Sequence, residues 1–315
     1  MKSVLVTGGL GFIGSNLSLA LINKGFYVDI VDNMSSSRPD FKEFLDKQSK
    51  INIIKTCFSD DKVLSNIRSG NYDCVFHVAA IPRVSYSVEH PSETTDNNVN
   101  RTVKLIEACT GNVKRFIFSS SSSVYGGADV LPTPTTQPKD PKSPYAWQKS
   151  CVEDFISITC NLNPEFDAIC LRYFNVYGPG QFGDSAYATA VSAWCHAIKN
   201  GTSLRSDGTG EQTRDMCYVD NVVDANIKSM QSANKFSGER LNVACNDRVS
   251  NNEILDFLKS RFSGLTVNHA PFRSGDVMHT QADISESQEL IGYEPLVSFW
   301  EGLELTLDWW GLNGN

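Results

Sequence analysis

The chain has 315 residues, more than a single hydrophobic core usually organises, so we expect two packed domains or one large α/β domain with a lobe. Its 41% hydrophobic content excludes a largely disordered protein, and its formal net charge of −8 argues against a nucleic-acid-binding surface. No apolar run reaches the ~18–20 residues of a membrane-spanning helix, and the first residues lack a signal-peptide pattern, so we expect a soluble, cytoplasmic protein without membrane contact.

The nine cysteines are scattered, odd in number and without a CxxC pair. Free thiols in a reducing compartment explain this pattern better than disulfides or zinc. The five histidines show no ligand spacing, and we predict no metal site.

The first half of the chain alternates between strand-like and helix-like segments. Residues 3–7 are typical of a buried strand, residues 12–24 of a helix ended by Gly25, and residues 26–32 of a second strand. Further strands are expected at 51–56, 74–80, 115–120 and 166–174, with helices at 99–109 and 146–160 between them. This alternation predicts an α/β fold with a Rossmann-type, doubly wound parallel sheet.

The pattern loosens after residue 175. We expect a helix at 186–199, the Gly-rich segment SDGTGEQ, a strand–helix unit at 216–230 that returns to the first domain, and helices near 251–261, 284–291 and 299–310. Residues 1–175 and 215–245 are therefore assigned to the sheet domain, and residues 176–214 and 246–315 to a smaller C-terminal α/β lobe.

A glycine motif directly follows the first strand and opens the first helix. Its spacing is Gly8-x-x-Gly11-x-x-Gly14. Glycines at this spacing allow a tight turn, a close approach of the backbone to a pyrophosphate, and packing of the helix on the strand. In this strand–turn–helix context the motif predicts dinucleotide binding by the sheet domain, although a structural Gly-rich turn is the alternative.

An acidic residue, Asp32, ends the second strand, where it can bind both hydroxyls of the adenosine ribose. Because its carboxylate would repel a 2′-phosphate, NAD is favoured over NADP. Arg38 lies close by and leaves NADP open.

Tyr145 and Lys149 stand four residues apart after Pro144, so both project from one face of the first turns of a helix. A tyrosine is a poor base at its free pKa of about 10, but a nearby ammonium and a positive nicotinamide ring both favour the phenolate. The motif alone occurs by chance on amphipathic helices. The segment SSSSSVYG, at the end of a predicted strand, raises its weight, because ligands bind there in open α/β sheets.

Together these features resemble the extended short-chain dehydrogenase/reductases, and within them the UDP-hexose 4-epimerases. The segments that carry the resemblance span nearly the whole chain: GGLGFIG, HVAA, DNNVNRT, FSSSSSVYG, SPYAWQK, LRYFNVYGPGQ, GEQTRDMCYVDNVVDAN and RSGDVMHTQADIS.

The resemblance implies a catalytic set of three residues. Ser121 would hydrogen-bond the sugar 4-hydroxyl, Tyr145 would be the general base, and Lys149 would bind the nicotinamide ribose and lower the pKa of Tyr145. Carbon 4 of the sugar would give a hydride to NAD, and the 4-keto sugar would turn in the pocket and take it back on its other face. No net oxidation results, so NAD stays bound.

The resemblance also implies the binding residues. NAD contacts are expected, besides Asp32, from Gly8, Gly11, Phe12, Ile13, Gly14, Asn33, Phe58, Ala79, Ala80, Asn98, Ser119, Tyr145, Lys149 and Tyr173. Asn175, Arg214 and Arg273 would bind the UDP diphosphate, and Ser121, Ser122 and Asp276 would contribute to the substrate site. Arg83 is a candidate for contacting the hexose, although an ordinary loop arginine explains it equally well.

Several related reactions remain as alternatives. The 4,6-dehydratases carry Thr-Asp-Glu just before VYG, and decarboxylases carry Glu in the last of these positions, whereas this chain has Ser121, Ser122 and Ser123. Without a carboxylate there, elimination lacks its acid and base, so we favour an epimerase over a dehydratase, a uronate epimerase or a 4-keto reductase. A non-catalytic NAD-sensing module is the alternative from another class, but it would be expected to lose the Ser–Tyr–Lys set.

The substrate and the assembly are also inferred from the resemblance. Thr280 aligns with a gate position at which a small residue admits a 2-acetamido group, so UDP-GlcNAc and UDP-GalNAc are expected before UDP-Glc and UDP-Gal. A homodimer is expected through a bundle of helices near 95–110 and 145–162. The apolar residues considered for this bundle, which fit a core equally well, are Val99, Val103, Ile106, Val152, Phe155 and Ile156.

Overall fold

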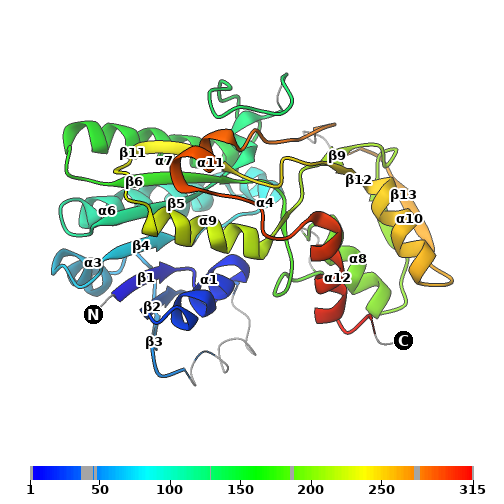
Figure 1. Ribbon diagram of the computed structural model, residues 1–315, viewed down its shortest axis with the longest axis horizontal. Coiled ribbons are helices and arrows are strands. Elements are labelled where there is room, and N and C mark those ends of the chain that lie inside the picture. Colours follow the sequence, from blue (N-terminus) through cyan, green and yellow to red (C-terminus); the bar gives the residue numbers. More distant parts are fainter. Residues whose placement is uncertain are drawn as a thin grey trace.

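A seven-stranded, fully parallel sheet lies at the centre of the computed structural model (Figure 1). The structure describes residues 3–36, 45, 48–127, 129–184, 188–272 and 277–313. The strands of the sheet are β1 (Ser3–Thr7), β2 (Tyr27–Asp32), β3 (Ile51–Lys55), β4 (Cys74–His77), β5 (Arg115–Ser121), β6 (Ala168–Tyr173) and β11 (Ser237–Val243). Their order is β11-β6-β5-β4-β1-β2-β3, so the direction of winding reverses between β1 and β4, where open α/β sheets bind ligands.

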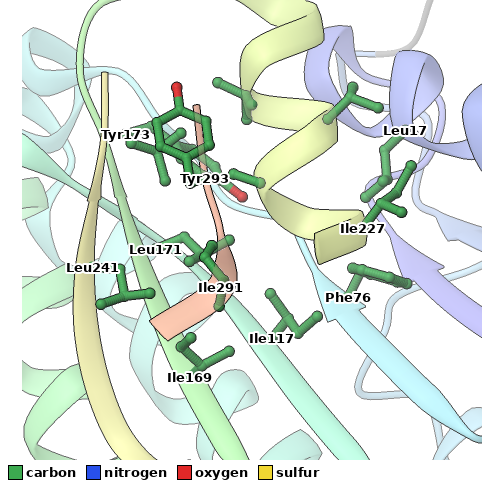
Figure 2. Close-up of a cluster of buried hydrophobic side chains, with 14 of the residues drawn as sticks. Leu17, Phe76, Ile117, Ile169, Leu171, Tyr173, Ile227, Leu241, Ile291 and Tyr293 are labelled. Atoms are coloured by element: carbon green, nitrogen blue, oxygen red, sulfur yellow. The ribbon is translucent and has the colours of Figure 1, made fainter. Parts of the chain in front are cut away.

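Both faces of the sheet are covered by helices, as the near-continuous apolar strands require. In β1, Val4 and Val6 pack in one core cluster, and Leu5 between them packs in the other. The first cluster, shown in Figure 2, lies under α1 (Phe12–Asn23), α9 (Val219–Gln231) and α11 (Ser285–Ile291). The second lies under α3 (Asp61–Arg68), α6 (Arg101–Cys109) and α7 (Pro144–Leu162). The predicted doubly wound Rossmann-type fold is therefore confirmed.

Local sequence signals fix the ends of the helices nearest the cleft. Gly25, with φ of +92°, follows the end of α1. At α7, Pro144 is the first helical residue and the Ser143 hydroxyl accepts a hydrogen bond from the Ala146 N–H at 3.2 Å. The orientation of Tyr145 in the first turn thus follows from the sequence itself.

The segment after β4 differs from the prediction. The strand ends at His77 rather than at residue 80, and the helix expected at 99–109 is preceded by further helical turns. These are α4 (Val84–Glu89), α5 (Pro91–Thr95) and the π-helical turn η1 (Asp96–Asn100), which continues into α6. A π-turn needs one extra residue in the helical ladder, and no periodicity of apolar residues signals it.

A smaller lobe lies beyond the carboxyl ends of the strands, on the right of Figure 1. It contains α8 (Ala190–Lys199), α10 (Asn251–Arg261) and α12 (Phe299–Trp309). The short strand pairs outside the main sheet are β7 (Val176–Tyr177) with β10 (Cys217–Tyr218), β9 (Thr213–Arg214) with β12 (Val249–Ser250), and β8 (Leu204–Asp207) with β13 (Val267–Ala270). A third core cluster, which includes Trp194, Leu255 and Leu303, holds the lobe together.

Two details of the lobe depart from the sequence analysis. The helix expected from Ala186 begins at Ala190, because Thr189 has extended backbone and its hydroxyl donates to Gln181 Oε1 at 2.7 Å; residues 185–187 lie outside the described residues. The helix α11, which the predicted division assigns to the lobe, packs instead against the sheet domain through Ile291 and the neighbouring Tyr293. The remaining domain division stays a prediction. In the part of the chain that the structure describes, no helix is long and apolar enough to cross a membrane.

Candidate active site

A cleft of about 1150 Å³ opens at the carboxyl ends of the central strands and extends towards the lobe. The turn after β1, the end of β2 and the ends of β5 and β6 all contribute to its walls. Predicted site residues that line it are Gly8, Gly11, Phe12, Ile13, Gly14, Asp32, Asn33, Phe58, Ala79, Ala80, Arg83, Ser121, Ser122, Tyr145, Tyr173, Asn175, Arg214 and Thr280. Most of the two predicted sets, for cofactor and for substrate, therefore meet in one cavity.

The glycine turn has the geometry that the motif predicts. Gly8 has φ of +69°, and a Cβ at Gly14 would lie 2.1 Å from the Gly8 carbonyl oxygen, so a larger residue at Gly14 would separate the helix from the turn. The first turn of α1, with Phe12 and Ile13, faces the cleft and contains no acidic residue. The exposed N–H groups and the positive end of this helix fit a pyrophosphate.

Asp32 is fixed at the end of β2 beside this turn and is only 8% exposed. One carboxylate oxygen accepts from the Leu10 N–H at 3.0 Å, and the other accepts from the Met34 N–H at 2.8 Å. The free lone pairs of this carboxylate can accept hydrogen bonds from two ribose hydroxyls. Asn33 and Phe58 line the same end of the cleft, whereas Arg38 lies outside the described residues.

Asn98 supports the cofactor wall from behind, because its side chain does not line the cleft itself. Its carbonyl oxygen accepts from the Ile81 N–H at 2.8 Å, and its amide donates to the Ile81 carbonyl at 3.1 Å and to Gln148 Oε1 at 2.8 Å. This buried amide therefore shapes the loop that follows Ala79 and Ala80, and its direct contact with NAD stays a prediction.

Ser121, Tyr145 and Lys149 converge where β5 ends against the start of α7. The Ser121 side chain lies close enough to the Tyr145 hydroxyl to oppose the rise of its pKa. Lys149 Nζ donates to the Ser119 carbonyl at 2.6 Å, lies 4.6 Å from the centre of the Phe118 ring and lies 5.9 Å from the centre of the Tyr145 ring. Lys149 is 4% exposed and does not line the cleft, so it lies behind Tyr145 as seen from the cavity.

The pKa values of this pair are dominated by burial. Burial raises the pKa of Tyr145 to about 12, although the Ser121 side chain opposes the shift. Burial also lowers the pKa of Lys149 to about 7, against the opposing effect of the Glu153 carboxylate. The expected lowering of the Tyr145 pKa by Lys149 stays a prediction; in this structure burial is the dominant influence on the Tyr145 pKa, and Lys149 Nζ lies almost 6 Å from the ring centre.

Ser119 and Tyr173 were expected to contact NAD, and the structure joins them to each other. The two hydroxyl oxygens lie 3.0 Å apart, and Asn226 Nδ2 donates to the Tyr173 hydroxyl at 2.8 Å. Tyr173 lines the cleft, but Ser119 is buried behind it. The Ser119 carbonyl, rather than its hydroxyl, makes the contact with Lys149.

The substrate half of the cleft is built around Asn175, Arg214 and Thr280. Asn175 has φ of +35°, and its amide donates to the Asp215 carbonyl at 3.0 Å and to the Thr280 hydroxyl at 3.3 Å. The guanidinium of Arg214 donates to the Thr213 carbonyl at 3.0 Å and to the Met278 carbonyl at 3.2 Å. Arg273 and Asp276, both predicted to bind substrate, lie outside the described residues.

Some residues that shape the site were missed by the sequence analysis. Ser87 is fully buried, and its hydroxyl accepts from the Tyr145 N–H at 3.0 Å, so α4 is tied to the catalytic helix. The buried carboxylate of Asp215 accepts from the Cys245 N–H and from the Ala282 N–H, each at 2.9 Å. Both interactions join segments far apart in the chain. The only sequence signal for Asp215 was its place beside Arg214 in the TRD segment.

Comparison with known proteins identifies the family. Residues 4–244 match the model of the NAD dependent epimerase/dehydratase family. The chain belongs to this family. A UDP-N-acetyl-alpha-D-glucosaminuronate decarboxylase from Bacillus cytotoxicus is 30% identical, over 98% of this chain and 97% of the relative.

Solved structures extend the likeness to the whole fold. A UDP-N-acetylglucosamine 4-epimerase from Methanobrevibacter ruminantium, in complex with UDP-N-acetylmuramic acid, is 36% identical with a TM-score of 0.92, over 99% of both chains. A UDP-glucuronic acid 4-epimerase from Bacillus cereus, in complex with UDP-glucuronic acid and NAD, is 30% identical with a TM-score of 0.90, over 98% of this chain and 99% of that one.

These findings confirm the predicted family, the Rossmann-type fold, the NAD cofactor and an NAD-dependent epimerase as the class of enzyme. The roles given to individual side chains remain predictions. Among the described residues, no group of three or more His, Cys, Asp or Glu side chains is placed to hold a metal ion.

Proposed function

We propose that this protein is an NAD-dependent 4-epimerase of a UDP-N-acetylhexosamine. The observation that carries the proposal is the surroundings of Ser121 and Tyr145, where Ser122 and Ser123 replace the acids that elimination needs. Among the described residues, the acids that line the cleft are Asp32, Glu93 and Asp96. Asp32 lies at the dinucleotide turn, Glu93 accepts from the Tyr86 hydroxyl at 3.0 Å, and Asp96 pairs with Arg101 at 2.9 Å.

The mechanism follows from the positions of the three catalytic side chains. Ser121 hydrogen-bonds the sugar 4-hydroxyl and orients it towards Tyr145, which takes the hydroxyl proton. Tyr145 can do so only when positive charge reaches the cleft, because burial alone raises its pKa to about 12. Bound NAD would supply that charge and a reversible acceptor for the hydrogen at carbon 4. After the 4-keto sugar has rotated so that its opposite face meets the cofactor, Tyr145 returns the proton to the oxygen at carbon 4. Tyr145 therefore ends the reaction in the protonation state in which it began.

The substrate half of the cleft suits a UDP-sugar with a 2-acetamido group. Arg214 offers forked donors to diphosphate oxygens. The Thr280 oxygen accepts from Asn175 Nδ2 at 3.3 Å and from the Asp215 N–H at 3.2 Å. Because a hydroxyl has two acceptor sites and one donor, its proton is left to donate into the cleft. An acetamido carbonyl is a suitable acceptor, and threonine leaves space for it that tyrosine would fill.

A sugar with a carboxylate is a second candidate substrate. Arg83 lines the cleft just before α4, the helix that Ser87 ties to Tyr145. A guanidinium in this position suits a carboxylate on the hexose. The resemblance to an epimerase of UDP-glucuronic acid and to a decarboxylase of an acetylated uronate supports this second candidate substrate.

The test is to incubate the purified protein without added cofactor and follow the products by proton NMR. UDP-GlcNAc, UDP-Glc and UDP-GlcA are supplied in separate reactions. Conversion of UDP-GlcNAc to UDP-GalNAc, faster than conversion of UDP-Glc, is the expected result. Faster turnover of UDP-GlcA, abolished by Arg83→Met, would favour the second candidate. A 4-keto-6-deoxy product, or loss of carbon dioxide, would refute an epimerase.

The proposed assembly is a homodimer built on α7. Four of the residues considered for the interface, Val99, Ile106, Val152 and Ile156, belong to the core of the sheet domain. The outward side of α7 instead presents Trp147, Ile158 and Leu162, which are 48%, 55% and 77% exposed. An apolar stripe of this kind on a long helix favours helix–helix association. We expect a dimer by analytical ultracentrifugation and a monomer after Ile158→Lys with Leu162→Glu.

The proposed location is the cytoplasm. All nine cysteines are free thiols, and thiols persist in reducing compartments. Detection of the protein in an oxidising compartment by fractionation would contradict this.

A further inference from the structure

A fully buried carboxylate, Glu153, stands directly behind the catalytic side chains. It lies on α7, one helical turn after Lys149, and is 0% exposed. One of its oxygens accepts from the Ser120 hydroxyl at 2.6 Å and from Arg172 Nε at 2.8 Å. The other accepts from Arg172 Nη2 at 2.7 Å. The carboxylate is thus held in a single orientation by three short hydrogen bonds.

Arg172, the main partner of this carboxylate, is 1% exposed and comes from β6. Its Nη1 donates to the Thr135 carbonyl at 3.1 Å, and its guanidinium lies 4.7 Å from the centre of the Tyr125 ring. Tyr125 belongs to η2 (Ser122–Tyr125), the turn that follows Ser121. Glu153 and Arg172 together therefore contact Ser120 and Tyr125, which lie before and after Ser121 in the chain.

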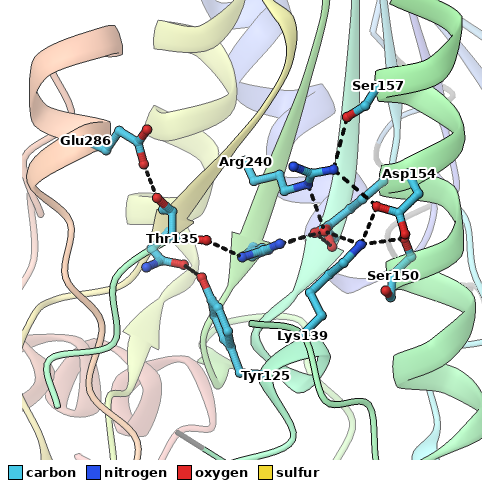
Figure 3. Close-up of polar contacts among 12 residues, drawn as sticks. Tyr125, Thr135, Lys139, Ser150, Asp154, Ser157, Arg240 and Glu286 are labelled. Carbon is cyan, nitrogen blue, oxygen red and sulfur yellow. Dashed lines mark hydrogen bonds and ion pairs between the residues drawn. The ribbon is translucent and has the colours of Figure 1, made fainter. Parts of the chain in front are cut away.

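Three further charged side chains, Lys139, Asp154 and Arg240, lie next to this pair and are labelled in Figure 3. Arg240 Nε from β11 lies 3.4 Å from Glu153, and Lys139 Nζ lies 3.9 Å from it. Both cations also pair with Asp154, which is 54% exposed. The outer part of the cluster is thus solvated, whereas the part next to β5 is buried.

Ser120 links Glu153 to the reaction centre. It lies between Ser119, whose carbonyl accepts from Lys149, and Ser121, the predicted contact of the sugar 4-hydroxyl. A shift of Ser120 would therefore move the partners of both Lys149 and Tyr145. Positioning of this kind matters because a displacement of about 1 Å can lower a rate by about 100-fold.

The charge of Glu153 acts on Lys149 as well. Burial lowers the pKa of Lys149 to about 7, and Glu153 is the strongest of the groups that oppose this shift. The other ionisable groups near the amine are Cys170 on β6, His77 on β4 and Tyr145 on α7. The groups that face Glu153 are Arg172 and Cys170 on β6, Arg240 on β11, Tyr125 on η2, Lys139 in the loop before α7, and Lys149 itself.

We propose that Glu153 is a positioning residue for the reaction, which holds Ser121 in register with Tyr145 through Ser120 and places a negative charge one helical turn from Lys149. A stabilising role alone would not account for it, because a buried ion pair is often no more stabilising than well-packed apolar residues. The inference rests on the proposed epimerase function. It means that the ion pair of Glu153 and Arg172 is needed for the rate of the reaction as well as for packing.

The main test compares Glu153→Gln with Asp154→Asn in the NAD-loaded protein. Each variant removes one carboxylate from α7, but Asp154 touches only the outer cations. For Glu153→Gln, the pH at which activity is lost on the alkaline side should fall by at least about one unit, because an adjacent opposite charge shifts a pKa by about 1–3 units. The kcat should fall at least about 10-fold with KM changed less than about 3-fold. Asp154→Asn should match the wild type.

Two further variants separate the two effects and control for folding. Ser120→Ala keeps the charge of Glu153, so it should lower kcat without moving the alkaline limb. Glu153→Met with Arg172→Met removes the ion pair without leaving a lone buried charge. This double variant should fold, as judged by circular dichroism and NAD content, and should reproduce the low kcat and the shifted limb. Wild-type kcat and an unmoved limb in the double variant would overturn the proposal.

A readout without turnover distinguishes failure of this inference from failure of the proposed function. The Lys149 amine is titrated by NMR in protein with nitrogen-15-labelled lysine and identified through Lys149→Met. Glu153→Gln should lower its titration point even if no UDP-sugar is converted. An unchanged titration point in Glu153→Gln would overturn the proposal even in an active epimerase.

Discussion

Replacing Lys149 by methionine should stabilise the cofactor-free protein at neutral pH while removing its activity. Lys149 is almost fully buried, and burial lowers its pKa from 10.5 to about 7. Between these values the unfolded chain binds one proton more than the folded protein. The free energy of unfolding of the wild type must therefore rise with pH in this window, and the methionine variant lacks the contribution.

The magnitude follows from the size of the shift. Folding lowers the pKa of Lys149 by about 3.5, and each pKa unit corresponds to about 1.4 kcal/mol. The free energy of unfolding of the wild type should therefore rise by roughly 5 kcal/mol over the whole window, and by about 3–4 kcal/mol between pH 7 and pH 10. Methionine also loses the hydrogen bond to the Ser119 carbonyl, 2.6 Å long in the wild type, which offsets about 1.5–3 kcal/mol. A net stabilisation of about 2 kcal/mol is expected at pH 7, and it should reverse by pH 10.

Urea unfolding of wild type and variant at several values between pH 7 and pH 10, both freed of NAD, measures this difference. Lys114→Met is the control, because it replaces a lysine whose side chain is 82% exposed. Parallel dependence of the two unfolding free energies on pH would refute the argument, because it would mean that Lys149 is not desolvated in the folded state.

The remaining predictions concern the reaction and its ligands. Tyr145→Phe should lower kcat by at least about 100-fold while UDP-sugar binding by calorimetry persists, because only the proton-transferring hydroxyl is lost; near-normal turnover would remove Tyr145 from its role. Thr280→Tyr should reduce kcat/KM for UDP-GlcNAc at least about 10-fold more than for UDP-Glc, because a larger side chain takes the space of the acetamido group; equal losses would contradict the gate. Asp32→Ala should raise the Kd of NAD by about 10- to 100-fold and weaken discrimination against NADP, because a charged acceptor beside the ribose is lost; unchanged cofactor preference would contradict the ribose assignment.

The parts of the site that the sequence determined are those built within a few residues. The glycine turn, the end of β2 at Asp32 and the pair of Tyr145 and Lys149 on one face of α7 are local features, fixed by glycine's freedom and by the 3.6-residue period of a helix. The alternation of strands and helices likewise predicted the parallel sheet and the edge at which the cleft opens.

Only the tertiary structure decided the contacts between distant segments. Asn175 meets Thr280 across 105 residues, and Glu153 meets Ser120 across 33. The same holds for α7, where folding buries Val152 and Ile156 and leaves Ile158 and Leu162 outside. Amphipathic spacing marks an apolar stripe but not which neighbour covers it, and a polar residue in a chain carries no sign of its partner. Burial, which sets the pKa values of Tyr145 and Lys149, exists only once the chain has packed around them.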